Sequence, residues 1–268
     1  MLKTILVTQD DPFYVLIFFK ELLKNDLIQK FDLKGVVIQP PLGKKSKKKL
    51  IKQMLDFYGY WNFTVIGFKY VFFKILNVLS VKIFKGNFPG TFSVEHLMLK
   101  NNIKIFELRN INSEDSISFL KSLDLDLIFS IAASQIFKDD VLKLPKLGCF
   151  NIHTAKLPKN RGMMPNFWSL YNYGTNQTSA ITVHRMNREL DDGEILLQQE
   201  FELDPKETLD SLITRTKKMS VNTFLAAIDL LNNGNFTYTP NDSKLATYNT
   251  FPKKEDVKKF KAKGLKLR

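Results

Sequence analysis

The sequence opens with Thr4-Ile-Leu-Val7, a short apolar run, and continues with a helical pattern from Phe13 to Leu23 and a second apolar run, Gly35-Val-Val-Ile38. This order is typical of a strand, a helix and a second strand. The alternation returns with Ile103-Lys-Ile-Phe106 and Asp126-Leu-Ile-Phe-Ser-Ile131, which flank another helical pattern. These elements predict a Rossmann-like α/β fold, an open and mostly parallel sheet with helices on both faces.

Composition narrows the class of protein. Of 268 residues, 44% are hydrophobic and 25% are charged, which excludes a disordered or fibrous chain. The single cysteine, Cys149, allows no internal disulfide and no cysteine-rich metal site, so we predict no metal and a reducing compartment. The first residues lack the long apolar run of a signal peptide, which predicts a cytoplasmic protein. The longest stretch without Asp, Glu, Lys or Arg, Gly162 to His184, is rich in polar residues, so no transmembrane helix is expected.

The net charge of +13 is concentrated in two places. Lys44 to Lys52 holds six lysines and no acid, and Lys253 to Arg268 holds eight basic and two acidic residues. Such runs are usually solvated, although they could contact phosphate, a tRNA backbone or an anionic membrane. The sequence contains no zinc finger, basic zipper or RNA-binding aromatic motif that would decide for nucleic acid.

Residues 41–101 form an insertion that is too long for a simple crossover. Tyr58 to Phe84 is rich in Phe, Tyr, Ile and Val. Its polar residues do not gather on one helical face, so an interfacial amphipathic helix is not expected. We predict a helix pair packed on the sheet or in a dimer contact, with a lid or partner-docking element as the alternative.

The C-terminal third contains one long predicted helix. Asp204-Pro-Lys-Glu207 is a capping box with Pro at the first helical position, and the apolar stripe behind it extends to about Asn232. One domain is therefore expected over residues 1–234. Residues 235–268 are expected to form a basic tail without a domain of its own.

Among the three histidines, His153 has the most informative surroundings. His96 and His184 are expected to be structural, whereas His153 ends the apolar run Gly148-Cys-Phe-Asn-Ile-His153. Asn151 and His153 lie two residues apart on a strand and so point to the same side of the sheet. A carboxylate in the downstream turn Glu189-Leu-Asp-Asp-Gly193 could reach the histidine.

The loop after the first predicted strand argues against one class of ligand. This loop, Thr8-Gln-Asp-Asp-Pro12, lacks the glycines that let a backbone wrap a dinucleotide pyrophosphate. A nicotinamide or flavin dinucleotide is therefore not expected.

The motifs together resemble those of the folate-dependent formyltransferases. The resemblance rests on Leu144-Pro-Lys-Leu-Gly-Cys-Phe-Asn-Ile-His153, Leu157-Pro-x-x-Arg-Gly162, Thr182-Val and Leu190-Asp-x-Gly193, in this order. That family includes methionyl-tRNA, glycinamide ribonucleotide and amino-sugar N-formyltransferases. The resemblance implies transfer of a formyl group from N10-formyltetrahydrofolate to an amine.

The resemblance also implies roles for particular residues. It places the catalytic trio on Asn151, His153 and Asp191. Asn151 and a protonated His153 would donate hydrogen bonds to an oxyanion, while Asp191 favours the imidazolium and accepts a proton. Asp192 is expected to be a solvated turn residue whose change to Asn has little effect. The residues that the resemblance implies for contact with the folate are Ser134, Gln135, Ile136, Phe137, Arg188, Glu189 and Leu190.

The acceptor is less constrained than the donor, and the resemblance leaves several candidates. The segment after Gly234 is too short for the β-barrel domain that methionyl-tRNA formyltransferases usually append, and the first loop lacks the glycines of glycinamide ribonucleotide formyltransferases. A nucleotide-linked amino sugar is therefore the expected acceptor. Four aromatic residues could stack on its base or sugar, or serve only in helix packing: Phe167, Trp168, Tyr171 and Tyr173. A formyltetrahydrofolate hydrolase and a non-catalytic folate- or tRNA-binding module remain open, as does a homodimer.

Overall fold

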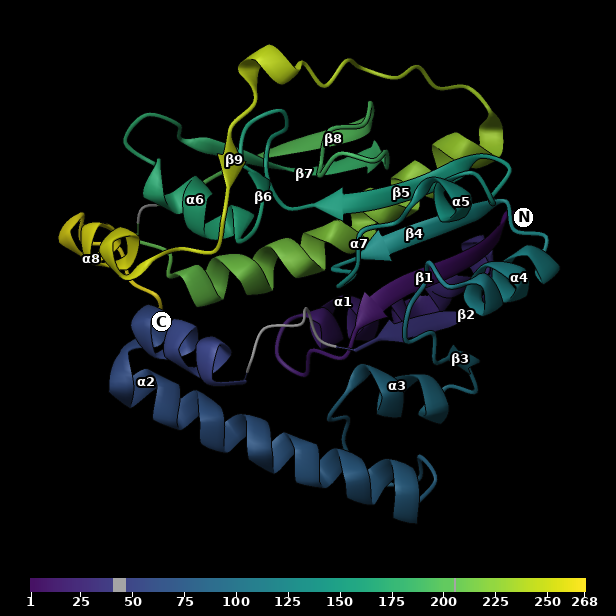
Figure 1. Cartoon of the computed structure of the whole chain (residues 1–268), viewed down its shortest axis with the longest axis horizontal. Helices are drawn as coiled ribbons and strands as arrows, with labels where there is room; N and C mark the ends of the chain where they lie inside the picture. Colours follow the sequence, from purple (N-terminus) through teal and green to yellow (C-terminus); the bar gives the residue numbers. More distant parts are fainter. Residues whose placement is uncertain (41–46, 205) are drawn as a thin grey trace.

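A computed structural model describes residues 1–40, 47–204 and 206–268, and its centre is a seven-stranded sheet (Figure 1). The strand order is β3-β2-β1-β4-β5-β7-β8. The first five strands of this order are parallel to one another, β7 runs antiparallel to β5, and β8 runs antiparallel to β7. The strands are β1 (Lys3–Gln9), β2 (Asp32–Gln39), β3 (Ile105–Phe106), β4 (Leu127–Ile131), β5 (Gly148–His153), β7 (Thr178–Arg185) and β8 (Ile195–Glu202). The predicted Rossmann-like fold is confirmed.

Helices cover both faces of the sheet because alternate strand residues supply apolar side chains to each face. On one face, Phe129 and Phe150 pack against α1, α3 and α7. On the other face, Ile128 and Cys149 pack against α4 and α5. The α-helices are α1 (Val15–Leu22), α2 (Lys47–Val78), α3 (Val94–Lys100), α4 (Glu114–Ser122), α5 (Asp139–Leu142), α6 (Pro165–Tyr171), α7 (Leu209–Asn233) and α8 (Lys254–Ala262). Shorter helical segments are η1 (Lys24–Lys30), η2 (Leu79–Ile83) and η3 (Ser243–Leu245).

Helix α7 begins later than the sequence predicts. Its N-cap is Thr208, whose side chain accepts a hydrogen bond from the Ser211 N–H. Asp204 instead accepts from the Lys206 N–H, in the segment that precedes the helix. The prediction for residue 205 lies outside the described residues.

The C-terminal segment packs on the domain. Its strand β9 (Tyr248–Asn249) pairs with β6 (Arg161–Gly162) in a second, two-stranded sheet. Val257 and Phe260 of α8 are buried in a cluster with α6 and the start of α7. The polypeptide after Gly234 therefore supports the loop that follows β5.

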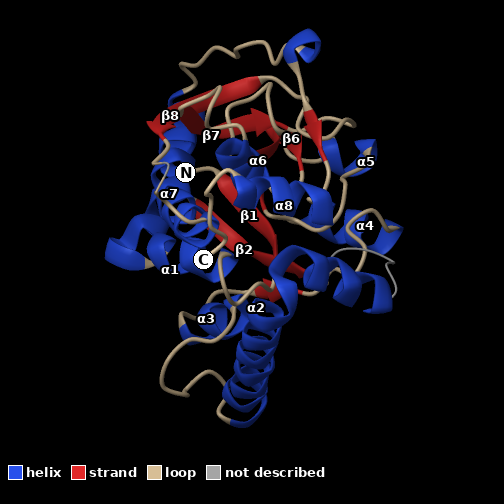
Figure 2. Ribbon diagram, turned by 90° about the vertical axis from the view of Figure 1, so that its left-hand side faces the viewer, coloured by secondary structure: helices blue, strands red, loops and turns tan. Residues whose placement is uncertain are grey.

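Helix α2 differs most from expectation. It bends at Gly59, whose φ of 74° ends one helical stretch and begins the next. Figure 2 shows the second stretch running away from the body of the molecule, so α2 and η2 form an arm rather than a pair packed on the sheet. Contacts hold only its body-facing side, where Phe13 packs on Tyr70 and Phe73.

The arm contains an apolar segment of membrane-spanning length that the sequence-based expectation did not consider. Lys48–Ile83 is long and apolar enough to cross a membrane by length and composition, and only 6% of its apolar window is buried. A search for charge-free stretches missed it because Lys69 and Lys74 interrupt the apolar sequence. Within the lysine run before it, Lys44 and Lys45 lie outside the described residues.

Candidate active site

Three of the predicted residues meet at the carboxyl ends of the parallel strands. Asn151 and His153 both lie on β5, and Asp191 reaches them from the turn between β7 and β8. Asn151 Nδ2 lies 3.3 Å from Asp191 Oδ1, and His153 Nδ1 lies 3.5 Å from Asp191 Oδ2. The structure therefore brings the predicted trio together around one carboxylate.

The turn that carries Asp191 is held by backbone geometry. Asp191 has a φ of 53°, and its Oδ2 accepts a 2.8 Å hydrogen bond from the Gly162 N–H. A Cβ at Gly193 would lie 1.8 Å from the Arg185 carbonyl oxygen, so this position of the Leu-Asp-x-Gly motif requires glycine. Burial raises the pKa of Asp191, but the neighbouring His153 and His184 and the Gly162 N–H outweigh it and hold the pKa well below its ordinary value. Asp191 is therefore a buried carboxylate.

The surroundings of His153 act on its protonation in two opposite directions. Its Nε2 donates to the Asn160 carbonyl oxygen at 2.8 Å, which leaves Nδ1 facing Asp191. Burial lowers the pKa of His153, and Asp191 only partly offsets this. Burial thus favours the neutral imidazole, whereas the Asp191 carboxylate favours the imidazolium. One proton can lie between His153 Nδ1 and Asp191 Oδ2.

His184 belongs to the site, although the sequence predicts a structural role. The antiparallel pairing of β5 with β7 places it directly opposite Asn151. Its Nε2 lies 3.2 Å from Asn151 Nδ2 and 3.4 Å from Asp191 Oδ1, while Nδ1 donates to the Arg185 carbonyl oxygen. Cross-strand register, which the sequence does not encode locally, explains why this contact was missed. By contrast, His96 is buried against the Gly86 carbonyl oxygen, as expected of a structural histidine.

Asp192 is an ion-pair partner and not a solvated turn residue. It pairs with Arg161, whose side chain is fully buried, and accepts a 2.6 Å hydrogen bond from Ser243 Oγ. The Arg161 guanidinium also donates to Asn241 Oδ1 and Tyr248 Oη. The Ser243 and Arg161 contacts lower the pKa of Asp192. This ion pair and the bonds to Asn241 and Tyr248 join the C-terminal segment to the turn that carries Asp191.

Two charged residues to which the sequence gave no role are linked electrostatically to the trio, Lys217 directly and Asp11 through Lys217. Lys217 of α7 is close enough to His153 for its positive charge to lower the pKa of the imidazole. Burial lowers the pKa of Lys217 itself, and the Asp11 carboxylate after β1 partly offsets this. Asp11 also accepts a 2.8 Å hydrogen bond from the Phe13 N–H. A helical spacing of apolar residues gave no signal for Lys217 because its neighbours on α7 belong to the core.

The predicted folate residues after β4 divide into two groups. Ser134 and Gln135 are tied to the protein, to Gln39 Oε1 and to the Ile111 N–H respectively. Phe137 is buried in the core, so its side chain is not free for a ligand. Ile136 is 64% exposed and is the apolar side chain that this loop presents to solvent.

The second predicted loop leaves one apolar side chain exposed. Arg188 is paired with Asp139 at the start of α5, which links this turn to the segment after β4. The Glu189 N–H is held by Asn187 Oδ1, and Leu190 is 48% exposed. Exposed apolar side chains on both loops, together with backbone groups, could contact a flat heterocycle.

A hollow of about 290 Å³ lies between α1, α2 and α7. Aromatic and charged side chains line it, including Phe13, Tyr14, Tyr58, Lys69 and Arg268. Tyr14 Oη donates to Asp210 Oδ1 at 2.6 Å. Burial, with a contribution from Asp11, raises the pKa of Tyr58 to about 12, so Asp11 lies within electrostatic reach of both the hollow and Lys217.

The four aromatic residues for which the sequence left open either stacking on an acceptor or helix packing lie in packing contacts. Phe167 is fully buried against Phe57 and Phe260. Trp168 Nε1 donates to the Thr250 carbonyl oxygen, while Tyr171 and Tyr173 pack against the same cluster. These side chains join α6 to α8 and to the start of α2.

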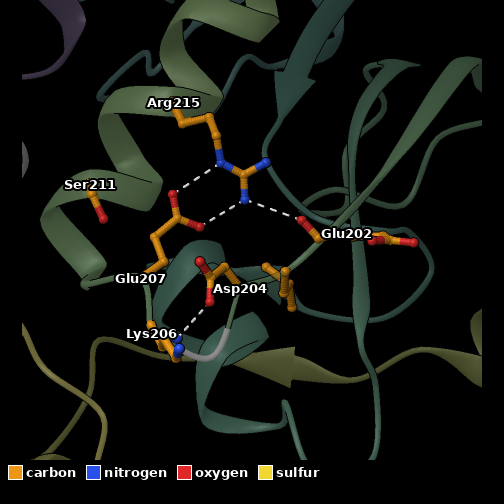
Figure 3. Close-up of a pocket in the computed structure, with 7 residues that line it drawn as sticks. Glu202, Asp204, Lys206, Glu207, Ser211 and Arg215 are labelled. Atoms are coloured by element: carbon orange, nitrogen blue, oxygen red, sulfur yellow. Dashed lines mark hydrogen bonds and ion pairs between the residues drawn. The ribbon is translucent and has the colours of Figure 1, made fainter.

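A second hollow lies at the start of α7, away from the trio (Figure 3). Arg215 points into it, but its guanidinium is bonded to both carboxylate oxygens of Glu207 and to the Glu202 carbonyl oxygen. Its cation is therefore already engaged. In the described part of the chain, no group of three or more His, Cys, Asp or Glu side chains could hold a metal ion.

Comparison with known proteins identifies relatives of this chain. Residues 88–228 match the family model described as formyl transferase. Over 158 residues, 59% of the chain, it is 37% identical to the methionyl-tRNA formyltransferase of Thermotoga maritima. The match covers 50% of that relative, so the chain spans about half the length of the methionyl-tRNA formyltransferases it matches.

Solved structures share the fold at lower identity. The N-formyltransferase of Helicobacter canadensis, solved in complex with folinic acid and dTDP-3-aminofucose, superposes with a TM-score of 0.56 at 18% identity and covers 93% of this chain and 71% of its own. Phosphoribosylglycinamide formyltransferase of Anaplasma phagocytophilum gives a TM-score of 0.57 at 14% identity and covers 92% of this chain and 98% of its own.

Proposed function

Because the chain belongs to the formyl transferase family, we propose that it transfers a formyl group from N10-formyltetrahydrofolate to the amine of a small-molecule acceptor. The observation that carries this proposal is the convergence of Asn151, His153 and Asp191 on one point at the carboxyl edge of the sheet. This edge is where ligands bind in open α/β sheets.

The donor would lie across the two loops that bring Ile136 and Leu190 to the surface. Their exposed apolar side chains suit the faces of a pterin ring, and peptide groups of residues 187–191 suit its polar edge. The Arg188–Asp139 ion pair would keep the two loops at a fixed separation. When bound, this donor supplies the formyl carbon and its carbonyl oxygen.

Asn151 would stabilise negative charge on that oxygen. Its Nδ2 directs its hydrogens toward His184 and Asp191, where an incoming carbonyl oxygen would compete for one of them. Such donors are most effective when they are held in place before the reaction. His184 would act here as a positioning residue, because it fixes the Asn151 amide without touching the reacting atoms.

His153 and Asp191 would handle the proton. As the amine nitrogen bonds to the formyl carbon, neutral Nδ1 of His153 takes one amine proton, and the buried Asp191 carboxylate stabilises the imidazolium that forms. The same proton can pass to the departing nitrogen when its bond to the formyl carbon breaks. The imidazole is then neutral again, and no oxidant, reductant or metal is needed for the balance.

For the acceptor, we favour a nucleotide-linked amino sugar. The hollow between α1, α2 and α7 offers aromatic faces from Phe13 and Tyr14 for a base or sugar and positive charge from Lys69 and Arg268 for phosphate. Asp11 and Lys217 extend this mixture of charges toward His153. The Helicobacter canadensis protein, which was solved in complex with dTDP-3-aminofucose, is consistent with such an acceptor.

A second candidate acceptor is charged tRNA. It is favoured by the 37% identity to the Thermotoga maritima methionyl-tRNA formyltransferase and by the two lysine-rich runs. Because a tRNA surface needs several phosphate contacts, transfer to this acceptor would weaken steeply with added salt. A nucleotide-linked sugar has far fewer phosphates and would show a shallower salt dependence.

An acceptor panel tests the proposal. Release of tetrahydrofolate from N10-formyltetrahydrofolate is followed with buffer alone, dTDP- and UDP-linked amino sugars, glycinamide ribonucleotide and methionyl-tRNA. We expect release only with a nucleotide-linked amino sugar. Release in buffer alone would indicate a hydrolase, release with another acceptor would replace our choice, and no release would contradict the enzymatic proposal.

A further inference from the structure

The outward side of the α2 arm is apolar along its whole second stretch. Residues 61, 65, 68, 72 and 75 recur every three or four positions, so they line one side of the helix. Trp61 is 80% exposed and Phe68 is 74% exposed. Other exposed apolar residues widen this outward face: Tyr60, Val65, Val71, Phe72, Ile75 and Val78. No charged residue interrupts it between Tyr60 and Val78.

The arm cannot hide this face by rotating. Its opposite side is held by the ring contacts of Phe13 with Tyr70 and Phe73. Further along, Asn77 bonds to Glu95 Oε2 at 3.2 Å and to Ser93 Oγ of the segment that starts α3. The body-facing side therefore has polar and aromatic partners in the domain, and the apolar side faces solvent.

The sequence of the arm and its flanks is strongly basic. Between residues 47 and 87, the sequence contains eight lysines and one acid, Asp56. Lys69 Nζ lies over the Phe13 and Phe73 rings, and Lys74 Nζ lies over the Tyr70 ring, so both lysines flank the apolar residues. Lysine stems can cover apolar surface while the ammonium reaches toward water or phosphate.

These charges select among possible occupants of the face. A second copy of the arm would match the apolar residues, but it would bring lysines against lysines with one acid to compensate. An anionic bilayer offers both an apolar interior and negative headgroups, and aromatic residues such as Trp61 and Tyr60 favour its interface. We propose that the outward face of α2 docks onto the surface of an anionic lipid bilayer, with the domain remaining in water.

The contacts of the arm favour lying on the bilayer over crossing it. A span would have to remove Asn77 and Phe73 from their partners Glu95 and Phe13. Docking by the outward face leaves these contacts intact. The proposal departs from the sequence-based expectation of no interfacial helix, which counted Asn77 as a polar residue of the arm although the domain engages it.

Vesicle flotation tests the proposal on the full chain. We expect the protein to float with vesicles of phosphatidylcholine and phosphatidylglycerol, and at least about tenfold less with phosphatidylcholine alone. The double variant Phe68→Ser/Phe72→Ser, which leaves the charge of the protein unchanged, should no longer float with the vesicles. The variant Lys74→Gln/Lys82→Gln should float less with anionic vesicles than the wild type does. Leu245→Ser removes a similarly exposed apolar side chain from η3 and serves as the matched control.

A fluorescence measurement locates the contact. The Trp168→Phe variant leaves Trp61 as the single tryptophan, and brominated lipids should quench it when anionic vesicles are present. Light scattering measures the molar mass in solution and so tests whether a second copy of the chain covers the outward face instead. Absence of flotation, equal flotation of the wild type and Phe68→Ser/Phe72→Ser, or a dimer that the same variant dissociates without any vesicle binding would overturn the proposal.

Discussion

The candidate active site and the α2 arm both depart from the usual distribution of side chains: the first buries charged residues, and the second exposes apolar ones. In the candidate active site, charged groups such as Arg161 and Asp191 are buried, and each is matched by hydrogen-bond partners. On the arm, large aromatic residues such as Trp61 and Phe68 are exposed. The first departure costs stability unless every partner is present, whereas the second costs little in the monomer and finds its use in contact with another surface.

The largest expected effect lies at the centre of the buried cluster. Asp191→Asn removes the carboxylate that accepts from Gly162 and faces His153 and His184, so we expect the rate of formyl transfer to fall at least about a hundredfold. Folate binding should be retained, since its proposed contacts lie mainly on other residues. Steady-state transfer and binding measurements check this, with Asp192→Asn as the control that keeps its rate. Equal losses in both variants would show that our assignment of the acid is wrong.

The next effect tests the burial of charge itself. Arg161→Lys shortens a fully buried cation that bonds to Asp192, Asn241 and Tyr248, so we expect the free energy of unfolding to fall by about 3 kcal/mol. Urea denaturation measures this. Arg188→Lys alters an exposed ion pair and should change the free energy by less than about 0.5 kcal/mol. A similar loss in both would contradict the structural role of Arg161.

Asp192→Asn should lower the stability of the protein, which differs from the sequence-based expectation of a solvated turn residue. The carboxylate is the ionic partner of buried Arg161, so its loss should lower the free energy of unfolding by about 1–2 kcal/mol, although transfer continues. The same urea titration gives the result. An unchanged midpoint would indicate that Ser243 and Asn241 alone satisfy the guanidinium.

The buried cluster also predicts how stability depends on pH. Burial lowers the pKa of His153 below 6.5, so the unfolded chain binds a proton at higher pH than the folded chain does. The free energy of unfolding should therefore decrease as pH falls below about 6.5. Asp191, whose folded pKa lies below 3.8, adds a further loss below about pH 4. Urea midpoints at about pH 7.5 and 5.5 should differ more in the wild type than in His153→Gln.

The smallest effect is expected on the arm. Phe68→Ser/Phe72→Ser exchanges two exposed side chains, so the free energy of unfolding should change by less than about 0.5 kcal/mol. The transfer rate in the absence of lipid should stay close to that of the wild type. Thermal unfolding and the transfer assay check this. A large loss would mean that the outward face packs within the protein, and the contrast between the two regions would fail.

Local patterns predicted the sheet and two members of the trio. The apolar run that ends at His153 fixes both the strand and the common direction of Asn151 and His153. Asp191 was assigned from the family motif, because an aspartate in a turn is too common to indicate a catalytic role by itself. His184 escaped prediction because it depends on the register of β7 against β5, and Asp192 was misread because its partner Arg161 lies 31 residues away.

The arm shows a different limit of sequence reasoning. An apolar segment predicts burial, and the sequence contains no sign of which side will meet the domain. Only the placement of Phe13, Ser93 and Glu95 decides that Phe73 and Asn77 are on the side of α2 that meets the domain. Exposure of the apolar side is therefore a property of the assembled fold.

The pairing of β9 with β6 bears on the timing of assembly during synthesis. Gly162, whose N–H holds Asp191, lies against Asn249 so closely that a Cβ would come within 2.3 Å of the Asn249 carbonyl oxygen. Arg161 likewise depends on Asn241 and Tyr248. The sheet can form while the chain is still being translated, but the turn that carries Asp191 gains these contacts only after residue 249 has left the ribosome. A nascent chain stalled before that point would be largely folded and without its finished site.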